Sequence, residues 1–196
     1  MENNVGVGSS FIETYSGKFF EVLDPKEDQI EIYDIAHALS MLCRFSGHCQ
    51  AFYSVAEHSV IVSMLVEREH ALSALMHDSS EAYLTDIASP VKPFLENYKT
   101  LEDKIMQVLS KKYEFTYPLP EEVKLADKAQ LKVEAKYLMS SGGKGWGTWL
   151  DGVQGRGKVP KCLQPIEAKQ LFLTRFWELS DKPVSLTGVS PIWVPN

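Results

Sequence analysis

The chain has 196 residues, of which 44% are hydrophobic and 11% aromatic, enough to bury one substantial core and to predict a single domain. A formal net charge of -6 and a pI of about 5.4 give no overall attraction for a nucleic-acid backbone or an anionic membrane, so neither is an expected partner. The three cysteines lack paired spacing and no apolar run approaches the length of a membrane span, which predicts a reduced, soluble, cytoplasmic protein.

The N-terminal part predicts a hairpin followed by a helix. Residues 1–10 are expected to be disordered. Residues 11–25 combine β-branched and aromatic side chains around a Ser-Gly pair, which is typical of a short hairpin. From Asp34, interpreted as an N-cap, apolar residues repeat with helical spacing.

Two more helices are expected in the middle of the chain. Ser54 stands three residues before Glu57, which predicts a capping box at the start of the second helix. Residues 69–87 predict one continuous third helix. Pro90 and Pro93 come after it and prevent it from extending further.

The C-terminal part predicts three further helices separated by loops. They cover residues 95–113, 120–140 and 165–180, with a glycine-rich loop over 140–158 and an extended tail over 181–196. The coarse prediction is therefore an all-α domain, residues 11–180, with a small N-terminal β-hairpin.

One segment of the third predicted helix gathers several acids around a histidine. Residues three and four apart share a helix face, so Glu81 is expected beside both His77 and Asp78. Apolar residues precede this cluster, so it is expected to face an interior cleft, where buried charges need partners or a metal. His58 and Asp127, each on its own predicted helix, are candidates for further ligands.

Each candidate also has an ordinary structural interpretation. A lone histidine such as His58 is more often a packed or surface residue, and a lone acid such as Asp127 is more often a capping residue. Spacing alone leaves the metal site and the ordinary interpretation both open.

Resemblance to a known family narrows these alternatives. A histidine, an HDxxE motif and a distant aspartate, in that order, resemble the HD superfamily of metal-dependent phosphohydrolases. Residues 42–59 and 75–92 resemble its 5'-deoxynucleotidase branch and, more closely, phage-encoded HD hydrolases that include the dATP triphosphohydrolases of phages making 2-aminoadenine DNA. The resemblance covers roughly residues 14–139 and implies an HD-domain helical bundle, located in the host cytoplasm if a phage encodes it.

The resemblance also implies roles for individual residues. It implies that one divalent transition metal, zinc, cobalt or manganese, is held by His58, His77, Asp78 and Asp127. Glu81 would be the acid or base that handles the attacking water, and Arg44 would bind phosphate. Asp86 would be a second catalytic or substrate-positioning acid, although an acid before Ser-Pro also suits a turn.

Further residues near these motifs have open interpretations. Lys92 is either a phosphate contact or a solvated charge, and His48 either binds substrate in the cleft or packs locally. A base would be read by residues 18–20 and by Ile35, although these follow no adenine-specific pattern.

The glycine-rich loop over residues 140–158 contains a spacing that resembles a phosphate-binding P-loop. Val159 stands where that motif needs serine or threonine, so we interpret the loop as a surface segment, a lid or an oligomer contact. Trp146 and Trp149 either cover a ligand or, as we expect, pack against the neighbouring helix.

The sequence therefore predicts a deoxynucleotide phosphohydrolase, favoured as a dATP triphosphohydrolase that releases deoxynucleoside and triphosphate. A 5'-deoxynucleotidase acting on deoxynucleoside monophosphates and a non-catalytic nucleotide-binding HD domain are the alternatives. A homo-oligomer is expected because the tail carries apolar side chains, Ile192, Trp193 and Val194.

Overall fold

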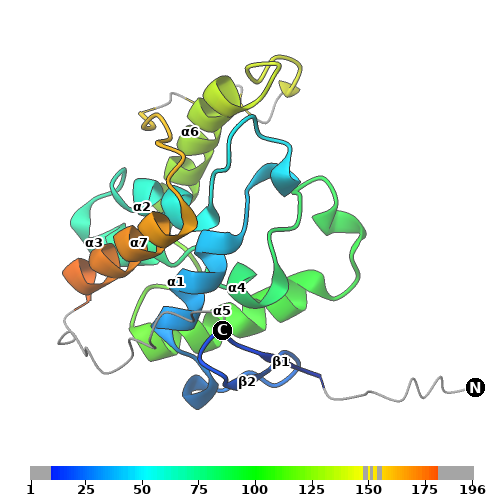
Figure 1. Ribbon diagram of the computed structural model, residues 1–196, viewed down its shortest axis with the longest axis vertical. Coiled ribbons are helices and arrows are strands. Elements are labelled where there is room, and N and C mark those ends of the chain that lie inside the picture. Colours follow the sequence, from blue (N-terminus) through cyan, green and yellow to red (C-terminus); the bar gives the residue numbers. More distant parts are fainter. Residues whose placement is uncertain (1–9, 148–149, 151, 154–155, 181–196) are drawn as a thin grey trace, which may run out of the picture.

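The computed structural model describes residues 10–147, 150, 152–153 and 156–180, to which all structural statements below refer. This part of the chain is mostly helical, with one small antiparallel sheet (Figure 1). The strands are β1 (Phe11–Glu13) and β2 (Phe19–Glu21). The α-helices are α1 (Ile32–Met41), α2 (Val55–Ser63), α3 (Arg68–Leu75), α4 (Glu81–Leu84), α5 (Tyr98–Tyr113), α6 (Glu121–Leu138) and α7 (Pro165–Leu179). Short 3-10 helices are η1 (Glu27–Gln29), η2 (Phe45–Gly47) and η3 (Lys92–Phe94).

The predicted helical fold with an N-terminal hairpin is confirmed at this level. None of the helices in the described ranges combines the length and apolarity needed to cross a membrane. The predictions of a disordered N-terminus and an extended tail fall on residues 1–9 and 181–196, outside the described residues, as do Trp149 and the tail's apolar side chains.

The hairpin is anchored to the helical core by one aromatic side chain. Ile12 pairs with Phe20 across the two strands, and Gly17 adopts a φ of 83° in the connecting turn, a conformation that glycine allows without strain. Phe20 is fully buried and stacks on Tyr83 of α4 with 3.8 Å between ring centroids. The hairpin is therefore packed against the core and does not stand alone in solvent.

Asp34 does not cap α1, contrary to the prediction. The helix begins at Ile32 with Glu31 at its N-cap, and Asp34 is buried inside the first turn. Its carboxylate accepts hydrogen bonds from the Ser16 amide at 2.7 Å and the Ser16 hydroxyl at 2.8 Å. An acid suits both the cap and the first turn, so the local sequence could not reveal that this one holds the hairpin.

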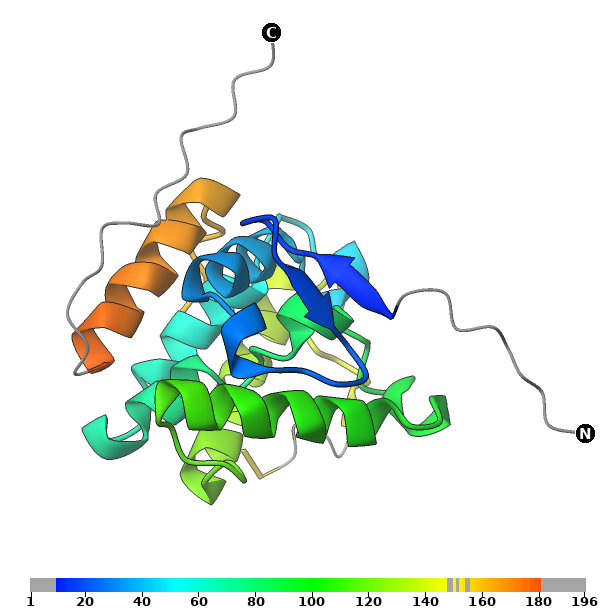
Figure 2. The same ribbon diagram turned by 90° about the horizontal axis from the view of Figure 1, so that it is seen from below.

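Helix α2 lies at the centre of the fold and is buried along its whole length. It contacts α1, α3, α6 and α7, and α7 lies alongside α1 (Figure 2). The predicted N-cap is confirmed, since the Ser54 hydroxyl accepts a hydrogen bond from the Glu57 amide at 3.1 Å. The Glu57 carboxylate does not complete a capping box; it accepts from the amides of Lys161 and Leu163 and so fixes the segment before α7.

The predicted continuous helix over residues 69–87 is wrong. Helix α3 ends at Leu75, a series of turns follows, and α4 begins at Glu81. In a continuous helix the carbonyl of Ala74 would accept from the Asp78 amide, but here it accepts from Nδ1 of His77 at 2.8 Å. The HD pair therefore lies in a turn, where the His77 side chain bonds the carbonyl of Ala74.

Candidate metal centre

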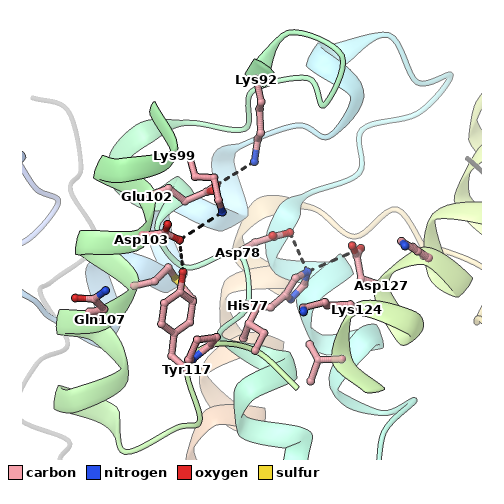
Figure 3. Close-up of a pocket in the computed structure, with 15 residues that line it drawn as sticks. His77, Asp78, Lys92, Lys99, Glu102, Asp103, Gln107, Tyr117, Lys124 and Asp127 are labelled. Carbon is pink, nitrogen blue, oxygen red and sulfur yellow. Dashed lines mark hydrogen bonds and ion pairs between the residues drawn. The ribbon is translucent and has the colours of Figure 1, made fainter. Parts of the chain in front are cut away.

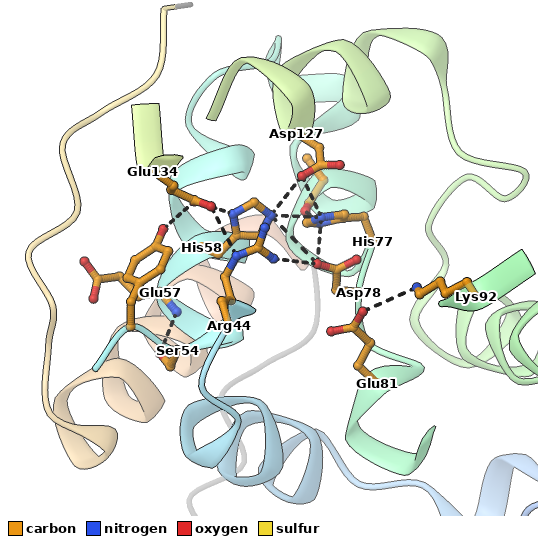
Figure 4. Close-up of polar contacts among 12 residues, drawn as sticks. Arg44, Ser54, Glu57, His58, His77, Asp78, Glu81, Lys92, Asp127 and Glu134 are labelled. Carbon is orange, nitrogen blue, oxygen red and sulfur yellow. Dashed lines mark hydrogen bonds and ion pairs between the residues drawn. The ribbon is translucent and has the colours of Figure 1, made fainter. Parts of the chain in front are cut away.

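Three side chains from separate segments converge on one point (Figure 4). His58 comes from α2, His77 from the turn after α3, and Asp127 from α6. Nε2 of His58 lies 3.1 Å from Oδ1 of Asp127 and 3.3 Å from Nε2 of His77. One ligand atom from each residue lies within 4.8 Å of the other two, so this group can hold a metal ion.

The outer nitrogens of both imidazoles are held by oxygen acceptors. Nδ1 of His77 lies 2.8 Å from the carbonyl oxygen of Ala74, and Nδ1 of His58 lies 2.6 Å from Oε1 of Glu134. A carbonyl oxygen only accepts, so His77 carries its proton on Nδ1 and directs the Nε2 lone pair inward. Nε2 of His58 faces this lone pair and Oδ1 of Asp127, two electron-rich atoms that are held together only by a positive charge, a proton or a metal ion, at that nitrogen. This donor set therefore fits a cation.

The charges around His58 also favour a cation at its inner nitrogen. Burial and Arg44 oppose a positive His58, but the carboxylates of Glu134 and Asp127 outweigh them and raise its pKa to about 9. Burial likewise opposes ionisation of Asp127, yet His58 and His77 hold the pKa of that carboxyl below its usual value. Excess negative charge thus surrounds the point where the ligand atoms meet.

Asp78 borders the centre, although it lies outside the three-residue group. Its Oδ2 is 3.1 Å from Nε2 of His77, 3.8 Å from Nε2 of His58 and 3.6 Å from a terminal nitrogen of Arg44. Burial favours the protonated acid, but these three neighbours hold the pKa of Asp78 well below its usual range. It is therefore an ionised carboxylate beside the three-residue group.

Glu134 is a residue of the site that the sequence interpretation missed. It is fully buried, and its carboxylate accepts from the Tyr53 hydroxyl at 2.7 Å and from Nε of Arg44 at 3.2 Å, besides its bond to His58. Arg44 opposes the cost of burial and, with His58, lowers the pKa of Glu134 to about 2. Glu134 follows Asp127 by seven residues, two helical turns, and this shared face of α6 was the available signal.

Glu81 and Lys92 lie next to the centre but face one another. Glu81 is buried, its Oε1 is 3.7 Å from Nζ of Lys92, and its Oε2 has no hydrogen-bond partner in the described part of the chain. Burial, and then the negative charges of Asp78 and Asp86, raise the pKa of Glu81 well above its usual value. Nζ of Lys92 also bonds Glu102 at 3.1 Å. Lys92 is thus a paired lysine at the site.

Two cavities open beside the metal centre. The first, called here the metal cleft, has a volume of about 650 Å³ and is lined by residues that include His77, Asp78, Lys92, Lys99, Lys124 and Asp127 (Figure 3). The second, called the aromatic cavity, has a volume of about 300 Å³ and is lined by residues that include Arg44, Phe45, Asp86, Pro90, Leu131 and Trp146. Arg44 of the aromatic cavity contacts Asp78 of the metal cleft, so the centre lies where the cavities approach each other.

The remaining predicted site residues divide between the cavities and the rest of the fold. Asp86 lines the aromatic cavity, whereas His48 is exposed and lines neither cavity. The proposed base readers are placed elsewhere: Phe20 and Ile35 are fully buried in the core, and Lys18 pairs with Glu31. Phe20 and Ile35 are therefore not available to read a base, because both are packed in the core.

Comparison with known proteins finds relatives whose names state no activity. The chain is 42% identical to the Uncharacterized protein YfdR of Escherichia coli strain K12 over 175 residues, which cover 88% of this chain and 97% of the relative. It is 36% identical to the Uncharacterized protein RCAP_rcc00048 of Rhodobacter capsulatus over 131 residues, 62% of this chain and 67% of the relative. No model of a protein family matches the chain.

Proposed function

The chain belongs to the family of the Escherichia coli protein YfdR, and we propose that it is a metal-dependent phosphohydrolase of deoxynucleotides, of the HD type that its motifs resemble. The observation that carries this proposal is the convergence of two imidazole Nε2 atoms and a carboxylate beside a large cleft. Phosphoester hydrolysis with a metal needs a held ion, space for substrate and a nearby acid or base.

Four residues of the chain would hold the ion. His58, His77 and Asp127 form the group already described, and Asp78 supplies a fourth ligand oxygen close to both imidazoles. Mixed imidazole and carboxylate ligands suit zinc, cobalt or manganese. When bound, the ion would polarise a phosphoryl oxygen and lower the pKa of a water molecule.

Glu81 would transfer the proton. Burial and then the charges of Asp78 and Asp86 raise its pKa, which favours the protonated carboxyl, and its Oε2 has no partner within the described residues. A protonated Glu81 can give that proton to the 5' oxygen that leaves the phosphorus, and the carboxylate that remains can accept one from water.

Arg44 and Lys92 would bind the phosphate. Nε of Arg44 is held by Glu134, which orients the guanidinium while its terminal nitrogens face the centre near Asp78. A guanidinium held in this way can meet phosphate oxygens with little loss of side-chain freedom. Lys92 reaches the same region from the far side of Glu81.

The two cavities and the metal centre lie in order along α6, which would orient a bound substrate parallel to this helix. Leu131 lines the aromatic cavity, Asp127 belongs to the metal centre, and Lys124 lines the metal cleft. With a rise of about 1.5 Å per residue, these positions lie roughly 6 Å and 4.5 Å apart along the helix. A nucleotide with its nucleoside in the aromatic cavity and its α-phosphate at the centre would extend further phosphates toward Lys99, Lys124 and Lys128.

This arrangement supports a triphosphate as the substrate. A cleft lined by several lysines suits the charge of a β- and γ-phosphate, and the resemblance to phage enzymes selects dATP. Attack of water at the α-phosphorus breaks its bond to the 5' oxygen. Deoxyadenosine and intact triphosphate are then the products.

A 5'-deoxynucleotidase is the second candidate, because acids partly offset the lysines of the metal cleft. Lys92 bonds Glu102, and Nζ of Lys99 lies 3.6 Å from Asp103. A monophosphate would need only the metal centre, Arg44 and the aromatic cavity.

Incubation with individual deoxynucleoside mono- and triphosphates tests the proposal. The metal-loaded protein is incubated with each nucleotide and the products are separated by chromatography. We expect deoxynucleoside and triphosphate from dATP. Turnover of dAMP without turnover of any triphosphate would select the nucleotidase, and binding without turnover of either would select a non-catalytic nucleotide-binding domain.

A further inference from the structure

The aromatic cavity is built by two segments that are far apart in the sequence. Phe45 comes from η2 after α1, and Trp146 comes from the glycine-rich segment after α6. Their ring centroids are 5.9 Å apart, and Arg44, which reaches the metal centre, lies beside Phe45. An aromatic pair thus lies next to the residue proposed to bind phosphate.

Glycines bring Trp146 to this position. Gly143, Gly145 and Gly147 have φ values of 79°, 85° and 60°, in the left-handed region that side chains with a Cβ rarely adopt. A Cβ at Gly145 or Gly147 would meet no atom within 4 Å, so these two glycines are needed for backbone conformation and not for space. The indole is therefore placed by the glycine-rich backbone. The expectation that it only packs against a helix is incomplete.

Phe45 is also placed by an uncommon backbone conformation. Phe45 and Ser46 have φ values of 57° and 52°, which cost energy for residues other than glycine. Hydrogen bonds on either side hold this turn, from the Arg44 amide to the Tyr53 carbonyl at 2.9 Å and from the His48 amide to the Phe45 carbonyl at 3.0 Å. Backbone strain of this kind is concentrated at ligand sites.

The two rings form a corner, because their planes meet at 64°. A flat ring that stacks on one of them presents its edge to the other, and both arrangements are favourable between aromatic systems. The volume of about 300 Å³ is at the lower end for ligand pockets and matches a group the size of a nucleoside.

We propose that Trp146 and Phe45 form the binding corner for the nucleobase and that stacking on Trp146 makes purines bind better than pyrimidines. The proposal rests on the proposed function and adds the residue that selects the base class. A purine covers more of the indole than a pyrimidine does, so the preference follows from ring area. Such stacking distinguishes base size and gives little discrimination between adenine and guanine.

Binding is measured by calorimetry with dAMP and dCMP in EDTA, so that no turnover is needed. The variants are Trp146→Ala and Trp146→Leu, and the matched control is Trp177→Phe, at a partly buried tryptophan of α7 that packs against the core. Circular dichroism checks that each variant folds. Trp146→Leu retains apolar bulk and decides the question if Trp146→Ala does not fold.

The proposal predicts that both Trp146 variants bind dAMP about 10-fold more weakly, with a smaller loss for dCMP, and that the control matches the wild type. Equal binding of dAMP by wild type and Trp146→Leu would overturn it, as would equal losses for dAMP and dCMP. Binding that depends on Trp146 in a protein without hydrolase activity would keep the corner and remove the proposed function. Hydrolysis by a protein whose nucleotide binding does not depend on Trp146 would keep the proposed function and remove the binding corner.

Discussion

Replacing Glu134 by glutamine removes a buried charge while preserving the shape of the side chain. All three partners of the Glu134 carboxylate, the Tyr53 hydroxyl, Nδ1 of His58 and Nε of Arg44, act as hydrogen-bond donors to it. Glutamine has one acceptor oxygen and one donor nitrogen, so at least one contact becomes an unfavourable pair of donors. The proton on Nδ1 of His58 is then no longer fixed, and its Nε2 lone pair is less available to a metal.

The expected loss has two measurable parts. Removing a group that orients a metal-binding imidazole lowers metal affinity by about 10- to 100-fold. Breaking a buried ion pair costs about 3 to 5 kcal/mol, and we expect the lower end because glutamine keeps one acceptor and Arg44 keeps Asp78 as a neighbour. Metal affinity is measured by competition with a chromogenic chelator, and the free energy of unfolding by urea denaturation in EDTA.

Glu57→Gln is the matched control. Glu57 is also a buried glutamate, but its carboxylate accepts from the backbone amides of Lys161 and Leu163, away from the metal centre. We expect this variant to lose stability while metal affinity stays within about twofold of the wild type. A Glu134→Gln protein with wild-type metal affinity would refute the proposed orientation of His58.

Three further outcomes follow from the site and the chain. Glu81→Gln should lower kcat by about 10²- to 10⁴-fold with unchanged metal content, measured by elemental analysis; wild-type turnover would remove its role as acid or base. The Lys99→Ala, Lys124→Ala double variant should raise KM for dATP by about 10-fold without changing dAMP binding, and a parallel loss for both ligands would contradict a polyphosphate cleft. Light scattering should show a closed homo-oligomer, and a mass of 22.1 kDa alone would reject it.

The residues of the candidate metal site could be proposed from residue type together with the family resemblance, although spacing alone left the site open. His58, His77 and Asp127 were each selected from residue type and apolar neighbours, and the fold brings the three together. Their backbone setting was less predictable. Successive i to i+3 turns and an α-helix favour similar patterns of residues, and the bond from the His77 side chain to the Ala74 carbonyl near the end of α3 has no sequence signature.

The surroundings of the site depend on contacts between distant segments, which the pattern along one helix does not contain. Glu134 looks like an ordinary acid of α6 until Tyr53 and Arg44, from other segments, are placed around it. Trp146 reaches the aromatic cavity through a glycine-rich segment whose path no periodicity predicts. Asp34 similarly has the local pattern of a cap and the tertiary role of a tether to the hairpin.

The most direct test of a metal-dependent deoxynucleotide phosphohydrolase is phosphorus NMR of dATP with the protein after chelation and again after one divalent ion is restored. The proposed site predicts no reaction after chelation and, on restoration with zinc, cobalt or manganese, the appearance of intact triphosphate together with deoxyadenosine. A His77→Ala, Asp78→Ala protein should remain inactive with the same ions. Stable dATP under every metal, or dAMP and pyrophosphate as products, would contradict the proposed reaction.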